Sequence, residues 1–404
     1  MATQRSGQRW VLDALVTLGG WDILHPEVRG FFEELGYYHS DVDRVFGKVG
    51  STLHFARAWG TTAQEVERKA RWAEERGFKG AARDFYARAM LLYGRAQYGF
   101  YGDDPRKRAF HQKLVHCFYK VADYDPTPFE RVELPFEGKK LYAIFALPGG
   151  DGPHPCVILG PGMDMFKEDW VAAMKRYFLP RGFACLSIDG PGQGESLLNG
   201  LKCTLDNYER AGSTFIDYLC TREEVDKDRI VLFGVSMGSY WGSRIAAHDE
   251  RLKACATCMG CYGTMHVIFN VAQPNFKLNF MYMAGYEDEE KFDREVLAHM
   301  FLGDLVKKIK CPYLMAHGEF DELTPLDDAI ATYERAAPPK EMWVYGNEYH
   351  PMGGVGSDFL SQGADWLLSM LEGNFTPDMD RRFFIEKDGT FSDKDVRPPW
   401  WSSA

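Results

Sequence analysis

The fold is decided by the stretch Arg229-Ile-Val-Leu-Phe-Gly234-Val-Ser236-Met-Gly238-Ser-Tyr-Trp-Gly242. A run of β-forming residues comes first, then the pattern G-x-S-x-G, then a segment that can begin a helix. A tight strand-to-helix turn of this kind holds its serine in a strained backbone conformation, and glycines two residues to either side clear the neighbouring chain. So short a pattern also occurs by chance, but the strand before it and the helix after it favour a nucleophile at Ser236.

The chain around this stretch alternates short β-rich runs with segments of helical length. The β-rich runs lie at residues 130–134, 141–147, 156–159, 184–188, 229–233, 253–258, 313–316 and 342–345. Helical spacing recurs between them, for example at residues 169–179 and 206–219. We therefore predict an α/β fold with a mostly parallel twisted sheet and helices on both faces. The first two runs are close enough to form an antiparallel hairpin at the edge of this sheet.

Residues 1–128 differ from this pattern because they are mostly helical. Thr62 offers an N-cap with Glu65 three residues later, and apolar residues then recur near helical spacing as far as Ala96. The run Asp123-Tyr-Asp-Pro-Thr-Pro128 interrupts the chain with two prolines. We expect a helical N-terminal region at 1–128 and a separate catalytic domain at 129–404.

The alternation of strands and helices fails between residues 260 and 310. Methionine and aromatic residues crowd this span, and the charged run Tyr286-Glu-Asp-Glu-Glu290 follows them. Insertions of this kind after a sheet strand commonly cover a site. The sequence therefore predicts a lid-like insertion at about 260–310.

Length and composition exclude several classes of protein. Hydrophobic residues make up 45% of the chain and charged residues 26%, which is typical of a folded protein. Its 404 residues exceed the length that a single hydrophobic core usually supports. Its net charge of −11, without a basic patch, disfavours a nucleic-acid partner. Apolar stretches fall short of the roughly 18 residues that a membrane span needs, and the N-terminus lacks the pattern of a cleaved export signal. We expect a cytoplasmic protein with no membrane partner.

The cysteine pattern does not predict a metal site. Nine cysteines, an odd number, indicate reduced thiols in a cytoplasmic protein. Cys255, Cys258 and Cys261 form a C-x-x-C-x-x-C run, but positions three apart on a strand point to opposite faces. No fourth thiolate or histidine is spaced to close a tetrahedral site, so we interpret these cysteines as structural and expect no metal.

Two later loops carry residues that could complete a catalytic triad with Ser236. The run at 313–316 continues into His317-Gly-Glu-Phe-Asp321, and the run at 342–345 continues into a loop that carries His350. All three groups would meet at the carboxyl edge of the sheet, where His350 can take the serine proton while Asp321 fixes its tautomer. Alone, Asp321 could instead cap a helix and His350 could be an ordinary loop residue. His317 is the rival base, and we expect it to pack behind the site.

Two backbone N–H groups are candidates for an oxyanion hole. The Met237 N–H would lie at a helix N-terminus, pointing at developing negative charge. The loop after the run at 156–159 reads Gly160-Pro-Gly162-Met163, and its glycines let the backbone pass close to a carbonyl oxygen, which assigns the Met163 N–H as the second donor. Asp164 follows directly and would lie at the mouth of the site, or would cap a helix that begins at Lys167.

A glycine-rich loop, Asp189-Gly-Pro-Gly-Gln-Gly-Glu-Ser, follows the run at 184–188. It superficially resembles a phosphate loop. It lacks the Gly-Lys-Ser/Thr ending of such a loop and the G-x-G-x-x-G spacing of a dinucleotide site. We interpret it as a turn and expect no cofactor.

These motifs together resemble the landmarks of the α/β-hydrolase superfamily over residues 130 to about 375. The usual order is kept by Gly-Val-Ser236-Met-Gly, the glycine-rich loop, His317-Gly-Glu-Phe-Asp321 and Asn-Glu-Tyr-His350. More narrowly, the helical N-terminal region and Gly162-Met-Asp164-Met-Phe-Lys-Glu168 look like the group that contains 2,6-dihydroxypseudooxynicotine hydrolase and the fungal polyketide-shortening pigment hydrolases.

The resemblance carries further expectations. Enzymes of that group cleave a carbon–carbon bond beside an aryl ketone without a metal. The resemblance implies that the N-terminal helices and the insertion together cap the active site, and that the protein forms a homodimer. It also implies that Asp164 binds and orients substrate, with a side chain one methylene shorter than the Glu of the nicotine-breakdown enzyme.

The predicted function is that of a serine hydrolase acting on a small, aromatic carbonyl compound. Hydrolysis of a C–C bond expels a carbanion, so a hydroxylated aryl ketone or a polyketide-like compound is the expected substrate. A carboxylesterase or amidase acting on an aromatic or apolar acyl group ranks slightly below, because the same triad serves each reaction. The competing class is a non-catalytic binding protein on the same fold.

Overall fold

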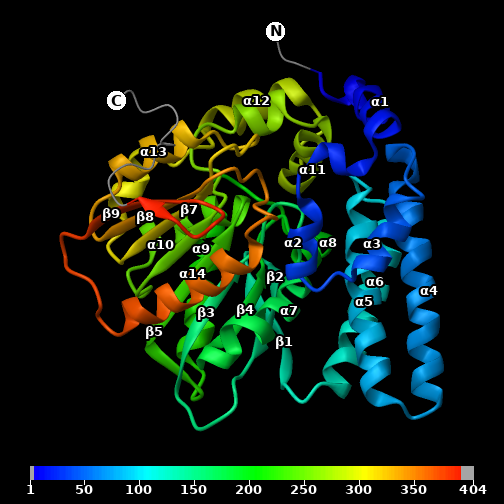
Figure 1. Ribbon diagram of the computed structural model, residues 1–404, viewed down its shortest axis with the longest axis horizontal. Coiled ribbons are helices and arrows are strands. Elements are labelled where there is room, and N and C mark those ends of the chain that lie inside the picture. The colour runs from blue at the N-terminus through cyan, green and yellow to red at the C-terminus, as the bar shows by residue number, and fades with distance from the viewer. Residues whose placement is uncertain (1–3, 393–404) are drawn as a thin grey trace.

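A single mixed sheet organises the computed structural model, which describes residues 4–392. Its ten described strands follow the order β1-β2-β4-β3-β5-β6-β7-β8-β9-β10. Neighbours from β4–β3 to β8–β9 pair in parallel, and β1–β2, β2–β4 and β9–β10 pair antiparallel. The predicted α/β architecture and its edge hairpin are confirmed (Figure 1).

Every predicted β-rich run corresponds to a strand. The strands are β1 Phe129–Phe136, β2 Lys139–Ala146, β3 His154–Gly160, β4 Ala184–Asp189, β5 Val225–Val235, β6 Cys255–Cys258, β7 Tyr313–Gly318, β8 Lys340–Tyr345, β9 Asp380–Ile385 and β10 Phe391–Ser392. Strands β9 and β10 were not predicted. In β9 the apolar run is limited to the three residues Phe383–Ile385, of which only Phe384 is buried, so the signal for a strand near the sheet edge is weak.

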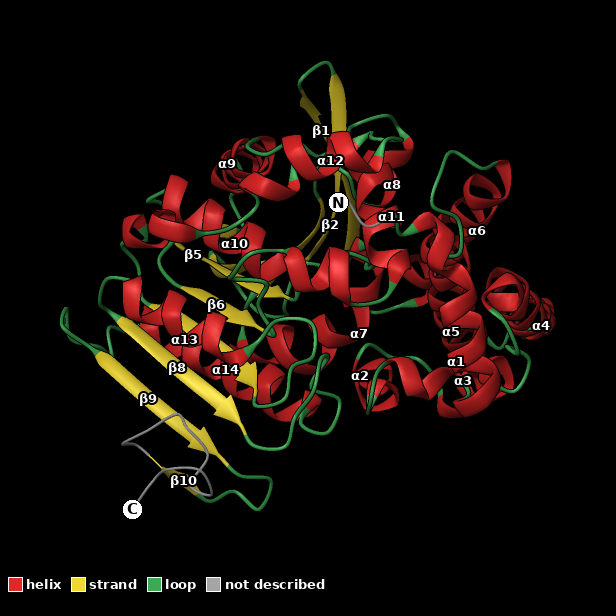
Figure 2. Cartoon of the chain, turned by 90° about the horizontal axis from the view of Figure 1, so that it is seen from above, coloured by secondary structure: helices red, strands yellow, loops and turns green. Residues whose placement is uncertain are grey.

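Alternate residues along the central strands enter two different cores. In β3, Val157 and Leu159 pack into one core, while Cys156 and Ile158 pack into the other. This follows from the period of two along a strand. Helix α14 (Gly356–Leu371) contributes to the first core, and α9 (Asn207–Cys220), α10 (Met237–His248) and α13 (Leu326–Arg335) contribute to the second. The sheet is therefore covered on both faces (Figure 2).

Helices occupy most of the chain before β1. They are α1 Arg9–Gly19, α2 Val28–Glu34, α3 His39–Phe46, α4 Phe55–Glu75, α5 Lys79–Tyr98 and α6 Pro105–Tyr124. The predicted N-cap at Thr62 is wrong, because α4 begins at Phe55 and Thr62 is buried inside it. The apolar pattern also includes Ala58 and Trp59, which are buried, so the helix begins earlier in the sequence than predicted.

The helix predicted at 169–179 is broken in the structure. It consists of a 3₁₀ helix Lys167–Trp170, the short α7 Val171–Ala173 and a π-helical turn Met174–Phe178. The other helices are α8 Gly194–Leu198, α11 Pro274–Ala284 and α12 Glu289–Glu295. Within residues 4–392, no helix combines the length and apolar character that a membrane crossing requires.

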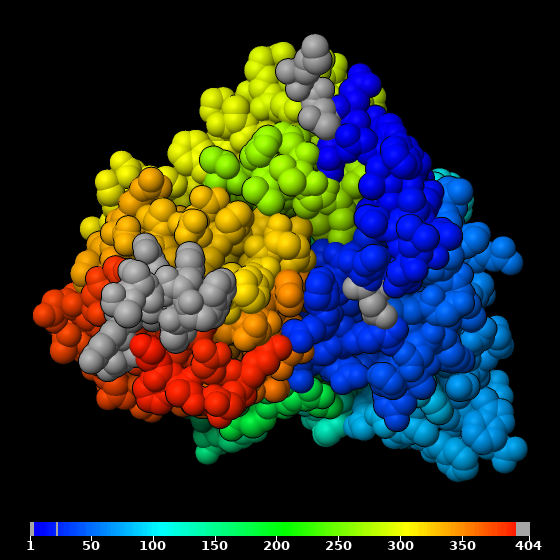
Figure 3. Space-filling view, turned by 45° about the horizontal axis from the view of Figure 1, so that its top comes forward, coloured from blue at the N-terminus to red at the C-terminus, as the bar shows by residue number. Residues whose placement is uncertain are grey.

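Arg5, near the start of the described residues, contacts the 260–310 segment, which contains α11 and α12. The backbone N–H of Arg5 donates to Glu289 at 2.7 Å, and the Arg5 guanidinium donates to the carbonyl of Asn270 at 3.1 Å. The N-terminal helices and the 260–310 segment adjoin on the molecular surface (Figure 3). Their assignment as a cap over the active site stays a prediction.

Candidate active site

Ser236 lies at the turn between β5 and α10. Its φ of 53° is in the left-handed region, which residues other than glycine rarely adopt. A Cβ at Gly234 would lie 2.4 Å from the carbonyl oxygen of Gly238, and a Cβ at Gly238 would lie 2.3 Å from that of Gly160. Only glycine fits at both positions, so the sequence pattern is explained by the close approach of two backbones.

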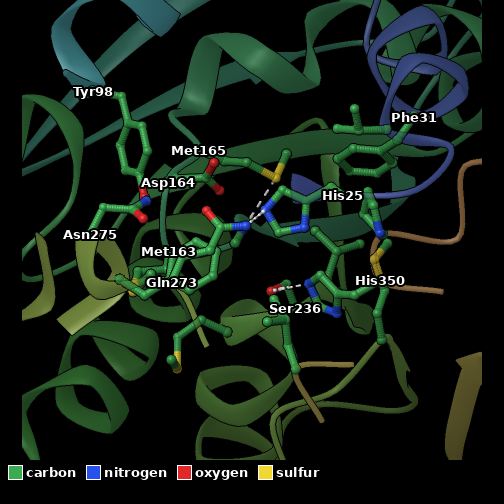
Figure 4. A pocket seen from close by; sticks show the side chains of 18 of the residues that line it. His25, Phe31, Tyr98, Met163, Asp164, Met165, Ser236, Gln273, Asn275 and His350 are labelled. Carbon is green, nitrogen blue, oxygen red and sulfur yellow. Dashed lines mark hydrogen bonds between the residues drawn. The ribbon is translucent and has the colours of Figure 1, made fainter. Parts of the chain in front are cut away.

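The structure brings the predicted triad residues into one hydrogen-bonded chain. Ser236 Oγ lies 3.0 Å from His350 Nε2 (Figure 4), and His350 Nδ1 lies 2.9 Å from Asp321 Oδ2. Ser236 follows β5, Asp321 follows β7 and His350 follows β8, so all three lie at the carboxyl ends of parallel strands. Ser236 is half-buried, whereas Asp321 and His350 are buried.

Electrostatics favour an ionised Asp321 beside His350. Burial alone would raise the pKa of Asp321, but His350 and the Thr324 backbone N–H lower this pKa to about 2. Burial alone would lower the pKa of His350, yet the Asp321 carboxylate outweighs it and raises this pKa above the ordinary 6.5. Glu322 also fixes the loop, because it accepts a hydrogen bond from the His350 backbone N–H at 3.0 Å.

His317 packs behind this chain, as expected. Its Nε2 donates to the carbonyl of Thr324 at 2.7 Å, and the same nitrogen lies 4.0 Å from Asp321 Oδ2. Burial lowers the pKa of His317. The helix-cap alternative for Asp321 is wrong, because the N-cap of α13 is Pro325. Asp321 Oδ1 instead accepts from the backbone N–H groups of Leu323 and Thr324, which fixes the loop after β7.

The Met163 and Met237 N–H groups belong to residues that lie beside Ser236. Both residues line the same pocket as the serine, and a Cβ on Gly162 would lie 3.3 Å from the Ser236 Cβ. Among the described residues, nothing accepts a hydrogen bond from either N–H. Two free donors beside a serine hydroxyl suit a developing oxyanion.

Asp164 lies on the wall of the pocket, where Arg95 holds it. Arg95 Nη1 donates to Asp164 Oδ2 at 2.5 Å, and the buried guanidinium lies over the Phe32 ring, 5.1 Å from its centroid. The helix-cap alternative for Asp164 is wrong, because the N-cap of the 3₁₀ helix is Phe166. The Asp164 side chain remains 36% exposed, so a carboxylate oxygen is available to a ligand.

Aromatic and aliphatic side chains form most of the pocket wall. Those before β1 are Trp21, Val28, Phe31, Phe32, Phe55, Trp59 and Tyr98, and those from the 260–310 segment are Ile268 and Phe276. Trp59 is fully buried and also lines the pocket, so packing and pocket formation are combined in one side chain.

Asn275 and Tyr98 are polar residues of the pocket that were not predicted. Asn275 donates through Nδ2 to the Tyr98 hydroxyl at 3.3 Å, while its buried Oδ1 has no hydrogen-bond partner in the part of the chain described. Figure 4 shows both residues on the same side of the pocket as Asp164, with Ser236 and His350 on the other side. A buried acceptor without a partner suits a donor on a ligand. No sequence signal singles out Asn275, because Asn270 and Asn279 lie in the same apolar insertion.

A second polar chain joins three separate segments beside His350. Gln273 Nε2 lies 3.2 Å from His25 Nε2, and His25 Nδ1 lies 3.3 Å from Glu322 Oε1. Since Glu322 also holds the His350 backbone, the N-terminal region and the insertion both connect to the loop that carries the imidazole. No local sequence pattern pairs residues so far apart.

The three cysteines of the C-x-x-C-x-x-C run are free and buried. Burial raises the pKa of each thiol, which disfavours the thiolate form that binds metals. Cys261 lines the pocket beside Ser236. Residues 4–392 contain no group of three or more His, Cys, Asp or Glu side chains placed to hold a metal ion.

Known proteins are similar to this chain in sequence and in fold. The profile of the family described as Esterase FrsA-like matches residues 40–297. The chain is 29% identical to 2,6-dihydropseudooxynicotine hydrolase of Paenarthrobacter nicotinovorans over 78% of this chain and 83% of that protein. It is 30% identical to 20-hydroxy-prefusarin hydrolase FUS2 of Gibberella moniliformis over 53% of each chain.

The solved structure of 2,6-dihydroxy-pseudo-oxynicotine hydrolase has the same fold. It superposes with a TM-score of 0.76 at 27% identity, covering 87% of this chain and 99% of that one. The profile match spans more than half of the present sequence. The chain therefore belongs to the FrsA-like esterase family and is an enzyme of the α/β-hydrolase group.

Proposed function

We propose that this enzyme is a serine hydrolase that cleaves a C–C bond next to the carbonyl of a hydroxylated aryl ketone or polyketide-like compound. The observation that carries the proposal is the Ser236–His350–Asp321 chain, with distances of 3.0 and 2.9 Å, beside an aromatic pocket. The similarity to a pseudooxynicotine hydrolase supports it.

In the first half-reaction, Ser236 Oγ bonds to the substrate carbonyl carbon while its proton moves to His350 Nε2. The carbonyl π electrons move to oxygen, and the Met163 and Met237 N–H groups hold the resulting oxyanion. Collapse of this intermediate breaks the C–C bond. The electron pair leaves with the ring carbon, which takes the proton from His350, and the acyl group stays on the serine.

In the second half-reaction, water replaces the departed arene. His350 Nε2 takes a proton from the water, whose oxygen bonds to the acyl carbon. Collapse breaks the bond to Ser236 Oγ, which recovers the proton from His350. The net reaction converts one ketone and one water into one arene and one carboxylic acid. Asp321 stays ionised throughout and stabilises the imidazolium.

The polar side of the pocket supports a hydroxylated ring. Asn275 Oδ1 and the Asp164 carboxylate are acceptors that suit phenolic O–H donors. Arg95 keeps Asp164 in place. Ring hydroxyl groups would bind these acceptors and would donate electrons into the ring, which eases protonation of the ring carbon by His350 as the C–C bond breaks. An ester substrate needs no such help, because an alkoxide or phenolate leaves more readily.

Hydrolysis of an aryl ester or amide is the second candidate, and it is supported by the similarity to FrsA-like esterases. Mass analysis of products separates the two. The enzyme is incubated with a hydroxylated aryl ketone, with the aryl ester of the same acyl group, and with the ketone lacking its hydroxyl groups. Release of arene and acid from the hydroxylated ketone supports the first proposal. Turnover of the ester alone would replace it with the second.

A further inference from the structure

The glycine-rich loop that follows β4 contacts the loop that carries the Met163 N–H. Gln193 lies in the middle of this glycine-rich loop and is 2% exposed. Its side-chain Nε2 donates to the carbonyl of Gly162 at 2.8 Å and lies 3.5 Å from the carbonyl of Pro161. On the other side, its Oε1 accepts a hydrogen bond from the buried hydroxyl of Tyr208.

The Gly162 carbonyl and the Met163 N–H belong to one peptide unit. Because the peptide is planar and trans, fixing the direction of this C=O also fixes the opposite direction of the N–H. The carbonyl accepts from Gln193 Nε2 at 2.8 Å and from the Met165 N–H at 3.2 Å. Both lone pairs are thus engaged, and the peptide plane is held from two directions.

We infer that Gln193 is a positioning residue for the oxyanion hole. It orients the Gly162–Met163 peptide so that the Met163 N–H points at the substrate oxygen, and its hydrogen bond polarises that peptide and strengthens the N–H as a donor. This inference rests on the proposed function, because it assigns a role in stabilising the oxyanion formed by attack of Ser236.

The residues around Gln193 explain why the loop has its glycines. A Cβ at Gly190 would lie 2.3 Å from the Tyr208 ring, and a Cβ at Gly194 would lie 2.2 Å from Asp189 Oδ2. The same Asp189 carboxylate accepts from the backbone N–H groups of Lys167 at 2.9 Å and Glu195 at 2.9 Å. We call residues 161–167, which follow β3 and carry the Met163 N–H, the oxyanion loop. Gln193 holds this loop near its middle, and Asp189 holds its far end.

Tyr208 fixes the side-chain amide of Gln193 in the required orientation. Because the Tyr208 hydroxyl donates to Oε1, the NH₂ group must face the Pro161 and Gly162 carbonyls. Tyr208 is itself buried and stacks on Trp241, with ring centroids 4.3 Å apart. A rigid aromatic pair thus supports the amide from behind.

The test replaces Gln193 by Met, which keeps the side-chain length and removes the donor. An aryl trifluoromethyl ketone reports on the oxyanion hole, because Ser236 adds to it and forms a bound oxyanion. The matching methyl ketone reports on ground-state binding. We expect kcat and trifluoromethyl ketone affinity to fall together by about 10- to 100-fold, with methyl ketone affinity changed by less than about threefold.

The control is Gln97→Met. Gln97 is a buried glutamine of α5 that lies 3.4 Å from His111 and does not line the pocket. The Gln97→Met variant should leave kcat and the affinities for both ketones unchanged. The inference is overturned when Gln193→Met keeps kcat and trifluoromethyl ketone affinity within about threefold of the parent. It is also overturned when the variant loses affinity for both ketones equally, because that result would mean a general loss of pocket shape.

A second variant, Gln193→Glu, covers the case in which Gln193→Met does not fold. Gln193→Glu keeps the acceptor for Tyr208 and presents an oxygen instead of a donor to the Gly162 carbonyl. We therefore expect the same falls in kcat and in trifluoromethyl ketone affinity, and the two outcomes that contradict the inference for Gln193→Met contradict it here as well. Failure of the proposed function is distinguishable. In that case the parent enzyme itself binds the trifluoromethyl ketone no better than the methyl ketone.

Discussion

Asp321 uses its two carboxylate oxygens for different tasks. Oδ2 lies 2.9 Å from His350 Nδ1, while Oδ1 accepts from the backbone N–H groups of Leu323 and Thr324. The backbone contacts fix the direction of the carboxylate, and the carboxylate fixes the imidazole. The position of His350 Nε2 beside Ser236 therefore depends on how the backbone of the loop after β7 holds the Asp321 carboxylate.

The raised pKa of His350 predicts the acid side of the pH profile. Only the neutral imidazole can take the Ser236 proton, so kcat/KM should fall as the pH drops through a value above 6.5. In Asp321→Asn the raising carboxylate is lost and burial then dominates, so the midpoint should move below 6.5 and kcat should fall about 10⁴-fold. Initial rates across the pH range check this, and an unmoved midpoint would contradict it.

Asp164→Asn separates a binding role from a structural one. Asn keeps the shape but weakens both the ion pair to Arg95 and the acceptor for a ring hydroxyl. We expect kcat/KM for a hydroxylated ketone to fall by about tenfold or more, with little change for the deoxy analogue and an unchanged melting temperature. Asp304→Asn, at an exposed position, is the control. A lower melting temperature with normal kinetics would instead make Asp164 structural.

At the scale of elements, a buried charge cluster joins the oxyanion loop to the sheet. Lys167 has no exposed surface, and its Nζ lies 2.7 Å from Glu168, 3.0 Å from Asp189 and 3.1 Å from Glu195. Burial raises the pKa of Glu168 to about 7 although the ammonium opposes this, whereas Lys167 and Arg131 outweigh burial and hold the pKa of Glu195 at about 2. Lys167, together with Arg131 at Glu195, thus balances several carboxylates away from water.

Lys167→Met should destabilise the fold strongly. It leaves buried carboxylates without their cation, so the free energy of unfolding should fall by about 3–5 kcal/mol. The deficit should shrink as the pH falls, because protonation removes the uncompensated charges. Urea denaturation at two pH values measures both effects. Lys307→Met, at an exposed ion pair with Asp304, should leave the free energy of unfolding almost unchanged. Equal losses in the two variants would refute the account.

The sequence predicted features that depend on local patterns. The strands from β1 to β8 were apparent because their apolar runs are buried, and Ser236 was apparent because the glycines on either side must clear a neighbouring backbone. Contacts between distant segments could not be predicted. Arg95 and Asp164, or His25 and Gln273, meet only after the helices pack on the sheet. The role of Asp164 as a helix cap was wrong for the same reason.

At the scale of the whole molecule, the pocket is assembled from three regions. The sheet edge supplies Ser236 and His350, the N-terminal helices supply aromatic walls, and the 260–310 segment supplies Asn275 and Phe276. We propose that the second and third regions together form a cap that selects aromatic substrates. The homodimer, the boundary at residue 128 and the cytoplasmic placement stay predictions.

The cap proposal is tested by trimming one side chain from each region. Phe31→Ala and Phe276→Ala should each raise KM for an aryl ester by about tenfold, because an aromatic wall of the pocket is lost. Hydrolysis of a small ester such as ethyl acetate should change by less than about twofold. Phe78→Ala, at an exposed aromatic of the same helical region, is the control. Equal effects on both esters would count against selection by the cap.

The central claim is that Ser236 is a nucleophile activated by His350. The most direct test is intact-protein mass spectrometry after reaction with a fluorophosphonate, comparing the parent with Ser236→Ala. We predict one adduct per chain on the parent, mapped to Ser236, and none on the variant. Equal labelling of both proteins, or no labelling of the parent, would contradict the account.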